Sequence, residues 1–532
     1  MEQTALKYKN PILSGFYPDP SICRVEGDFY LVNSTFAYFP GIPVFHSKDL
    51  LHWKQIGSAI DRPGQLCFDG HGISQGLFAP TIRYNKGIFY ILCTLINTGG
   101  NFIISAKDPS GPWSDPVWLA GADGIDPSIF FDDDGRAWYC GTHPAPEGEA
   151  YSGNYEIYIQ EMDMSAVAEG KNPLSGAKNG IWRGALRNVI WPEGPHIYKI
   201  GGWYYLLHAE GGTSYDHAVC VARAKNICGP WEGKKSNPVL THRYLGKRAE
   251  IINVGHADLF DDTEGNWWMA LLASRPFDGV CPLGRETFLV PIFWEDEWPC
   301  TATKSGLVEN EGELPFFANA EKHAPIEWSE SSCDHFTDRL PINWLVLRMP
   351  VNEKDAAFSL SSHPGALRLF TRAATLREKS HCAFAGRRLR HKDWAFSAEM
   401  EFSPKSESET AGIILLQSEN YQYRMELHGA QNLSLRLVKT AGKEDEVAAN
   451  TECRVKGKKI VLAVQCEEMK LSFYYGEDQY SLKPFVSEQD AKILSTEYSG
   501  GFVGTLAGVF ASGNGKDTEN YADVFWAEYR GL

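Results

Sequence analysis

No apolar run in this 532-residue sequence is long enough to cross a membrane, and its first residues carry no basic segment followed by an apolar one. We therefore predict neither a membrane anchor nor a secretion signal and expect a cytoplasmic location. Basic residues are also few, because 51 Lys and Arg stand against 67 Asp and Glu. A chain without a basic stripe is a poor binder of nucleic acids and anionic membranes, which favours a small, uncharged ligand.

Patterns typical of metal and redox sites are missing as well. None of the 12 cysteines forms a C-x-x-C pair, and several, such as Cys93 and Cys220, lie within apolar runs. We interpret them as buried free thiols, and not as a zinc site or a redox pair. The first part of the chain also lacks long segments with helical periodicity, which excludes a helix-rich fold there.

Aromatic residues, glycine and proline are abundant: 13% of the residues are aromatic, and there are 50 Gly and 29 Pro. One pattern recurs five times, and it consists of a short apolar segment, a turn with glycine and a segment with aromatic residues. This pattern is typical of a β-hairpin. The copies begin at Asp19–Ile22, Ala79–Ile82, Asp126–Ile129, Glu193–Ile197 and His256–Leu259.

The spacing of the copies predicts the architecture. Units of roughly 45–70 residues with a few strands each are typical of propeller blades, so five copies predict a five-bladed β-propeller over residues 1–310. Residues 311–330 are polar and do not alternate, which indicates a linker. Alternation returns over residues 331–532, where many short strands predict a β-sandwich. The predicted fold class is therefore all-β.

Equivalent positions of the innermost strands meet at the axis of a propeller. In this sequence we assign those positions to Asp19, Ala79, Asp126, Glu193 and His256. Asp-Pro and Glu-Gly-Pro are each common at turns, which is the structural explanation for any one of them. Three carboxyls at one repeat position are harder to explain in this way, because gathering like charges in a buried place is costly. The set therefore indicates chemistry.

Cleavage of a glycosidic bond needs such a set of acids. One carboxylic acid protonates the leaving oxygen, and a carboxylate acts on the opposite face of the sugar. A third acid can hold the pKa of the proton donor high through like-charge coupling. Aromatic rings beside the acids can stack on the C–H faces of a sugar.

Further motifs lie along nearly the whole chain. They are Tyr17–Ser21, Ser34–Phe36 with Phe39–Gly41, Gly124–Ser128, Glu193–Pro195, Ala209–Thr213, Pro282–Thr287, Asp334–Phe336 and Ala383–Arg388. On these residues the sequence resembles glycoside hydrolase family 43, specifically its two-domain β-xylosidase/α-L-arabinofuranosidase type. The motifs are specific in combination, whereas Asp-Pro-Ser alone is a weak signal.

The resemblance implies roles for single residues. Asp19 matches the general base of the family, Glu193 its general acid, and Asp126 the acid that orients the proton donor and raises its pKa. The family inverts the anomeric centre, so the resemblance implies a water molecule activated by Asp19. Arg285 matches the substrate-contacting arginine, whose guanidinium can donate to sugar hydroxyls; a structural ion pair is the alternative.

Three aromatic residues and one histidine complete the predicted site. Phe36 matches an aromatic wall of the sugar pocket, and Phe502 matches the loop by which the sandwich closes it. Phe78 stands where the xylosidases of the family usually carry tryptophan. His256 matches a channel histidine beside which some members hold calcium. Because calcium prefers oxygen ligands, we expect any such ion to be structural and held largely through water, and no cofactor to be required.

The implied activity is that of an exo-acting, inverting hydrolase. It would release terminal β-D-xylose, α-L-arabinofuranose or both from short oligosaccharides. Phe78 and the short segment Phe277–Leu283 leave the choice between the two sugars open. A retaining, fructosidase-like propeller and a sugar-binding propeller without activity are the alternatives. The family type often forms tetramers, so a homo-oligomer is a further expectation.

Overall fold

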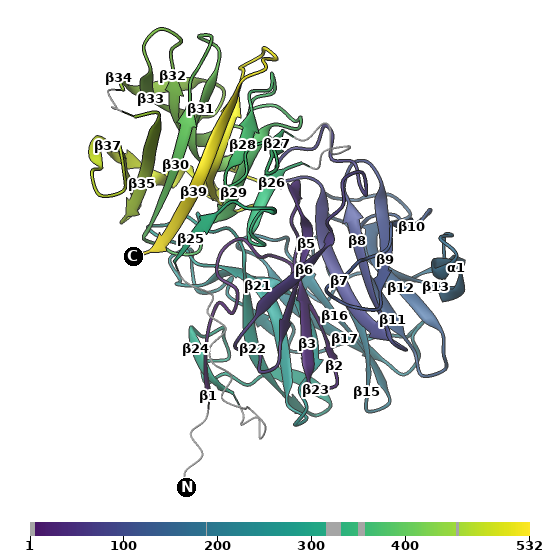
Figure 1. Ribbon diagram of the computed structural model, residues 1–532. Coiled ribbons are helices and arrows are strands. Elements are labelled where there is room, and N and C mark those ends of the chain that lie inside the picture. Colours follow the sequence, from purple (N-terminus) through teal and green to yellow (C-terminus); the bar gives the residue numbers. More distant parts are fainter. Residues whose placement is uncertain (1–5, 188, 315–330, 349–356, 454–456) are drawn as a thin grey trace.

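The protein consists almost entirely of β-strands arranged in two bodies (Figure 1). The structure is a computed structural model that describes residues 6–187, 189–314, 331–348, 357–453 and 457–532. The described α-helices are two short ones, α1 (Met164–Ala168) and α2 (Thr496–Ser499). No helix within the described ranges is long and apolar enough to span a bilayer.

Five antiparallel sheets form the first body, and each takes successive strands of the chain. The strands are β2 (Ser21–Val25), β3 (Asp28–Val32), β5 (Gly41–Ser47) and β6 (Lys54–Ile60); β7 (Leu77–Asn85), β8 (Ile88–Leu95), β9 (Gly100–Ala106) and β10 (Val117–Trp118); β11 (Ile125–Phe131), β12 (Ala137–Pro144), β13 (Tyr155–Met162) and β14 (Leu174–Trp182); β15 (Glu193–Ile200), β16 (Trp203–Glu210), β17 (Ala218–Ala224), β18 (Glu232–Gly233) and β19 (Leu240–Thr241); and β20 (Ile252–Asp261), β21 (Trp267–Ser274), β22 (Glu286–Glu295) and β23 (Trp298–Thr301).

The first strands of the five sheets form a ring. β2 contacts β7 and β20, and β11 contacts β7 and β15, while β15 and β20 also touch. Their alternating side chains pack between neighbouring sheets; Leu207 and Val219 of one sheet meet Leu259 and Leu271 of the next. The five-bladed propeller predicted from the repeats is therefore confirmed.

A short sheet joins the start of the propeller to its end. In it β1 (Leu6–Lys9) pairs with β24 (Glu311–Leu314), and a bridge links Leu13 to Thr287 of the last blade. The strand β24 lies within the segment predicted as a linker. Its sequence does not alternate, and only the closure of the propeller brings a partner strand beside it. The rest of that segment, 315–330, lies outside the described residues.

The second body is a β-sandwich of two eight-stranded sheets, as predicted. One sheet contains β25 (Ser332–His335), β27 (Phe358–Ser359), β28 (Leu367–Phe370), β30 (Trp394–Phe402), β35 (Lys459–Glu467), β36 (Lys470–Gly476), β37 (Lys483–Asp490) and β39 (Tyr521–Gly531). The other contains β4 (Tyr38–Phe39), β26 (Trp344–Leu347), β29 (Ala383–Arg388), β31 (Thr410–Ser418), β32 (Tyr421–His428), β33 (Ser434–Ala441), β34 (Asp445–Glu452) and β38 (Leu506–Ser512).

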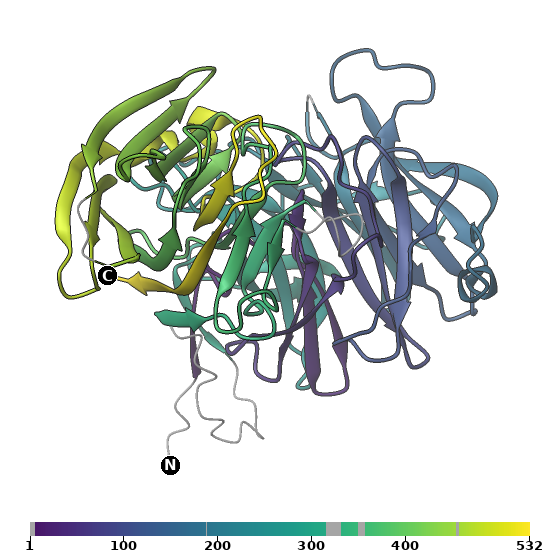
Figure 2. The ribbon, with the colours of Figure 1, turned by 45° about the horizontal axis from the view of Figure 1, so that its top comes forward.

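The sandwich lies against one side of the propeller in both views (Figures 1 and 2). The strand β4 comes from the propeller part of the chain but pairs with β26, so the second sheet extends into the first body. Beside it the fully buried Arg348 donates to the carbonyl of His71 at 2.7 Å and to the Glu419 carboxylate at 2.8 Å. Ile73 N also donates to Glu419. These contacts fix the loop that precedes β7 against the sandwich.

Candidate active site

A small pocket lies where the first strands of the blades meet and the sandwich touches the propeller. Its volume is about 80 Å³. All eight predicted site residues line it, together with three others. The lining residues are Asp19, Phe36, Phe78, Ala79, Ile125, Asp126, Glu193, Thr213, His256, Arg285 and Phe502. The structure thus brings together residues from all five blades and one residue of the sandwich.

The structure corrects one detail of the repeat. The residues Asp19, Ala79, Asp126 and His256 share a left-handed backbone, with φ between 33° and 55°, and the fifth residue with this conformation is Gly194, with φ 56°. Gly194, not Glu193, therefore occupies the equivalent position. The sequence agrees with this, because proline follows Gly194 as it follows Asp19, Ala79 and Asp126. Left-handed backbone is costly for residues other than glycine and is often found at functional sites.

Gly194 is needed for a second reason. A Cβ atom at this position would lie 2.7 Å from the ring of His256, which is closer than real Cβ contacts allow. The glycine therefore lets the histidine pack against the strand. Glu193, one residue earlier, projects into the pocket from the start of β15.

Asp19 is held as a carboxylate. It is 6% exposed and accepts hydrogen bonds from Arg285 Nη1 at 3.0 Å and Ser34 Oγ at 2.6 Å, while His256 Nδ1 lies 3.5 Å away. Burial alone would raise the pKa of Asp19, but the charge of Arg285, with His256 and Ser34, outweighs it and holds the pKa well below its ordinary value. Asp19 is thus an ionised base at neutral pH.

Glu193 has the opposite character. Burial, followed by the negative charge of Asp126, raises the pKa of Glu193 to about 8. Burial also raises the pKa of Asp126, and the negative charge of Asp19 raises it further. A hydrogen bond from Gly194 N, at 3.1 Å, acts in the opposite direction but does not cancel this rise. The two acids titrate as a coupled pair. Of the two acids, Glu193 has the higher pKa, which favours the protonated form that a general acid requires.

His256 carries a positive charge among these carboxyls. Burial by itself would lower its pKa, but the hydrogen bond to Asp19 and the charges of Asp126, Asp19 and Glu193 raise it to about 9. A protonated imidazole is not a metal ligand. Calcium takes about six to eight oxygen ligands, and the described side chains around His256 provide no such set. A calcium ion held through water stays a prediction, and no role in the reaction is assigned to it.

Arg285 joins the acids to the aromatic wall. Its Nη1 also donates to Thr213 Oγ1 at 2.6 Å, and its guanidinium lies 5.8 Å from the Phe36 ring centre and 5.5 Å from that of Phe502. Arg285 lines the pocket, and a guanidinium there can donate to a sugar hydroxyl. The ion pair with Asp19 and a substrate contact are therefore compatible.

The aromatic wall is shared by the two bodies. Phe36 and Phe502 stack with ring centres 6.0 Å apart, and Phe78 meets both rings edge to face. Phe502 N donates to Ser74 Oγ of the propeller at 3.0 Å, which fixes the loop of the sandwich over the pocket. Phe502 is far from the other pocket residues in the sequence, and only the docking of the sandwich brings it there.

Two lining residues were missed by sequence analysis, Ile125 and Thr213. Thr213 ends the Ala209–Thr213 motif, so the motif was a usable signal for it. Ile125 lies in the Gly124–Ser128 motif directly before Asp126, so that motif was a usable signal for it as well.

The next layer of the central channel is filled by an ion pair. Two residues beyond His256, Asp258 accepts two hydrogen bonds from Arg83, at 2.8 and 2.9 Å, and further ones from Ser21 and Tyr198. Because Arg83 and Asp258 are tightly paired and buried, the pocket ends above them. The pocket is therefore closed at its base.

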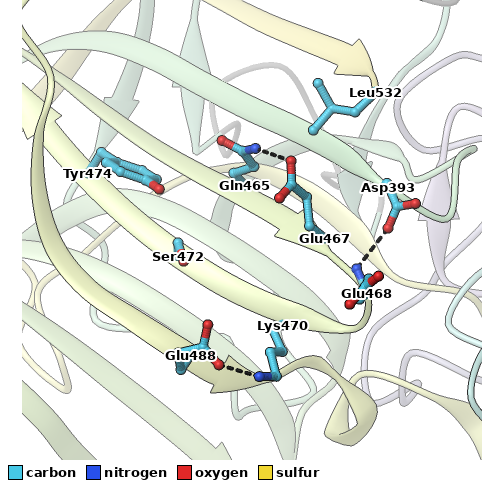
Figure 3. Close-up of a pocket in the computed structure, with 9 residues that line it drawn as sticks. All are labelled: Asp393, Gln465, Glu467, Glu468, Lys470, Ser472, Tyr474, Glu488 and Leu532. Carbon is cyan, nitrogen blue, oxygen red and sulfur yellow. Dashed lines mark hydrogen bonds and ion pairs between the residues drawn. The ribbon is translucent and has the colours of Figure 1, made fainter.

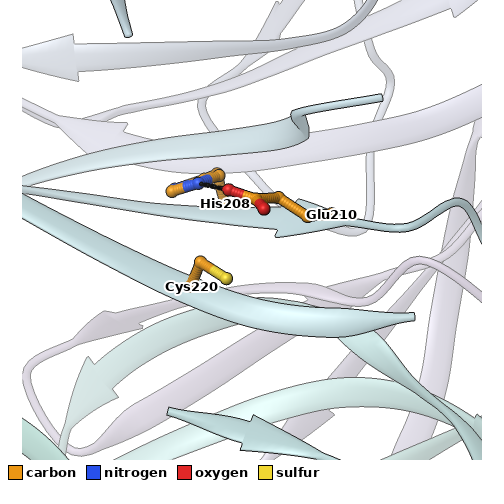
Figure 4. A group of neighbouring side chains, drawn as sticks. All are labelled: His208, Glu210 and Cys220. Atoms are coloured by element: carbon orange, nitrogen blue, oxygen red, sulfur yellow. Dashed lines mark hydrogen bonds and ion pairs between the residues drawn. The ribbon is translucent and has the colours of Figure 1, made fainter. Parts of the chain in front are cut away.

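One other cluster within the described residues places three metal-ligand atoms within 4.8 Å of one another: His208, Glu210 and Cys220 (Figure 4). Both Glu210 oxygens already accept hydrogen bonds, from the amides of Ala185 and Leu186. Burial, and then the charge of Glu210, raises the pKa of Cys220 well above its ordinary value. A protonated thiol does not bind metal. The cluster anchors the loop before Glu193 instead.

A larger hollow, of about 470 Å³, lies on the outer sheet of the sandwich (Figure 3). Its polar groups are satisfied by one another: Lys470 pairs with Glu488, Gln465 donates to Glu467, and Glu468 N donates to Asp393. It lacks the buried, closely packed carboxyls of the propeller pocket, and we assign no site to it.

Comparison with known proteins shows which family the chain belongs to. The profile of glycosyl hydrolases family 43 matches residues 8–299, and that of the β-xylosidase C-terminal concanavalin A-like domain matches residues 333–530. The chain belongs to glycoside hydrolase family 43. It is thus an enzyme, and the fold expected from the resemblance is confirmed.

Relatives of this family 43 chain match it over nearly its full length. A xylosidase/arabinosidase of Butyrivibrio fibrisolvens is 43% identical over 97% of both chains. A non-reducing end α-L-arabinofuranosidase of Bacteroides ovatus is 35% identical over 99% of this chain and 95% of its own. The crystal structure of a xylan β-1,4-xylosidase from Bacillus halodurans superposes with a TM-score of 0.87 at 30% identity, over 98% of this chain and all of the other.

The Asp126–Glu193 pair makes a prediction about pH dependence. Because ionised Asp126 raises the pKa of Glu193, we expect the alkaline limb of kcat/KM in D126N to move to lower pH, by about one unit. It should not return to the ordinary value of a glutamate, since burial remains. The pH profile measured with a nitrophenyl glycoside tests this. An unchanged alkaline limb would contradict the coupling.

Proposed function

We propose that this chain is an exo-acting, inverting glycoside hydrolase that releases terminal β-D-xylose, α-L-arabinofuranose or both from xylo- and arabino-oligosaccharides. The observation that carries the proposal is the division of charge in one small pocket. Asp19 is ionised beside Arg285, and Glu193 is protonated beside Asp126. Single displacement by water needs an ionised base and a protonated acid of this kind.

The reaction follows from these protonation states. Asp19 removes a proton from a water molecule that attacks the anomeric carbon, while Glu193 gives its proton to the leaving oxygen. Asp126 keeps the proton on Glu193 before the reaction, and its hydrogen bond from Gly194 N fixes it beside the acid. Arg285 orients the sugar from the pocket wall and keeps Asp19 ionised. The attack inverts the anomeric centre.

The shape of the pocket supports removal of terminal units. The Arg83–Asp258 pair lies below the pocket, and the stacked rings of Phe36 and Phe502 form one wall. A chain end can enter such a pocket, whereas the middle of a chain cannot. Relatives named for xylosidase activity, arabinosidase activity or both support pentoses as the sugars. A cytoplasmic location, which would suit imported fragments, and a homo-oligomeric state also belong to this proposal.

Paired substrates test the proposal. We expect hydrolysis of 4-nitrophenyl β-D-xyloside, 4-nitrophenyl α-L-arabinofuranoside or both, and proton NMR of fresh reactions should show the inverted sugar as the first product. A first product with retained configuration would favour the fructosidase-like mechanism instead. Binding of the pentoses without turnover of either glycoside would favour a sugar-binding protein.

A further inference from the structure

The general acid marks the side of the pocket from which the leaving group departs. Glu193 must reach the glycosidic oxygen, so the sugar beyond that oxygen lies on the Glu193 side, away from Arg285 and Phe36. The residues that flank Glu193 at the pocket mouth are therefore those that a leaving sugar meets. Trp191, two residues before Glu193, is the large aromatic residue of this segment and is partly exposed.

The position of the Trp191 ring is determined by two glycines from other loops. A Cβ at Gly153 or at Gly212 would lie 2.9 or 2.8 Å from the indole, so the ring packs directly on the backbone of both. Gly212 precedes Thr213, which lines the pocket. Trp191 N also donates to the Gly153 carbonyl at 2.8 Å. The ring is thus held beside the pocket by contacts on two sides.

The segment that carries Trp191 is itself anchored. Gly211 N donates to the Ile190 carbonyl at 2.9 Å, and Thr142 Oγ1 donates to the Pro192 carbonyl at 2.6 Å. Further upstream, Glu210 accepts hydrogen bonds from the amides of Ala185 and Leu186. Trp191 itself has a left-handed backbone, with φ 46°. A ring that is already rigid loses little entropy when a sugar stacks on it. The left-handed backbone of Trp191 is also consistent with a binding function, because strained backbone is often found at functional sites.

We propose that Trp191 is the platform on which the leaving sugar stacks, and that it sets the preference of the enzyme for glycosyl leaving groups. The ligand of this platform is a neutral sugar ring, whose C–H face stacks on the indole. The inference rests on the proposed function, because it uses Glu193 as the acid. The inference concerns a residue that does not line the pocket for the terminal sugar.

The experiment compares two leaving groups: a sugar, whose C–H face can stack on the Trp191 ring, and a fluoride ion, which cannot stack. For the pentose that the wild-type enzyme prefers, kcat/KM is measured with the disaccharide and with the glycosyl fluoride, whose leaving group is a single atom. In W191A we expect kcat/KM to fall about tenfold or more on the disaccharide and to stay within about twofold on the fluoride. W191F should recover most of the loss.

Trp118 provides a matched control. Trp118 is 38% exposed and, like Trp191, packs against a glycine, Gly99. Both residues belong to the blade of β7–β10, a different blade from that of Glu193. W118A should leave kcat/KM of both substrates unchanged. Equal losses on both substrates in W191A, or no loss on either, would overturn the inference. If W191A does not fold, as judged by circular dichroism, W191F and W191L carry the same comparison, and an unchanged ratio of the two kcat/KM values in both would overturn it.

The same data separate the two proposals. A wild-type enzyme that hydrolyses neither the fluorides nor the disaccharides of xylose and arabinofuranose overturns the proposed function, and the inference with it. A wild-type enzyme active on both, with a Trp191 variant that does not discriminate between them, overturns the inference alone.

Discussion

Replacement of Asp19 by asparagine is expected to lower kcat by at least about 10³-fold on every substrate, whatever its leaving group. The amide cannot take the proton of the attacking water, and a better leaving group does not replace this step. Arg285 and His256 would lose the anion that both of them contact. The measurement is kcat for a natural disaccharide and for an activated aryl glycoside, in wild type and D19N.

Asp132 offers a matched control for this variant. It is 7% exposed, about as buried as Asp19, and it pairs with Lys199 and Tyr204 in the propeller but outside the pocket. D132N should lower thermal stability with little change in kcat. Activity of D19N within tenfold of wild type would show that Asp19 is not the base.

Replacement of Glu193 by glutamine is expected to have an effect that depends on the leaving group. A sugar needs a proton to depart, so kcat for the disaccharide should fall by about 10²- to 10⁴-fold. A dinitrophenolate departs without help, so its loss should be much smaller. The wild-type kcat/KM should decline above pH 8, where Glu193, whose pKa is about 8, loses its proton. The decline should be clear for the wild type on the disaccharide, weaker on the dinitrophenyl substrate, and absent in E193Q.

Glu156 provides the control for the second variant. Glu156 lies in β13, is 6% exposed, and pairs with His143 and Arg183. E156Q should keep both the leaving-group dependence and the pH profile of the wild type. Equal losses of E193Q on the two substrates would remove Glu193 from the role of the acid, and would shift attention to Asp126.

The regular part of the protein could be predicted from its sequence. A repeat of a short strand, a turn and an aromatic strand can form only one kind of closed structure when it occurs five times, because each hairpin must bury its apolar faces against the next. The same logic predicted the sandwich from alternation. It could not predict that β4 leaves the propeller to pair with β26, or that β24 pairs with β1. Both pairings depend on where the two bodies meet.

The sequence predicted most of the residues that line the site, but not how they are placed relative to one another. The motifs indicated Asp19, Asp126 and Glu193, but Glu193 was aligned with the wrong residue of the repeat, although the proline that follows Asp19, Ala79 and Asp126 also follows Gly194. The motifs gave no sign that the Trp191 ring packs next to a residue of the pocket. That ring is positioned by glycines from two distant loops.

The sequence by itself thus determined the number of blades, the second domain and which acids gather at the axis, because these follow from periodicity and residue type. Only the tertiary structure decided which acid keeps its proton. That depends on burial and on the neighbours of each carboxyl: Arg285 and His256 beside Asp19, and Asp126 beside Glu193. The free energy of a charge is set by what surrounds it in space, and the chain brings Arg285 to Asp19 from 266 residues away.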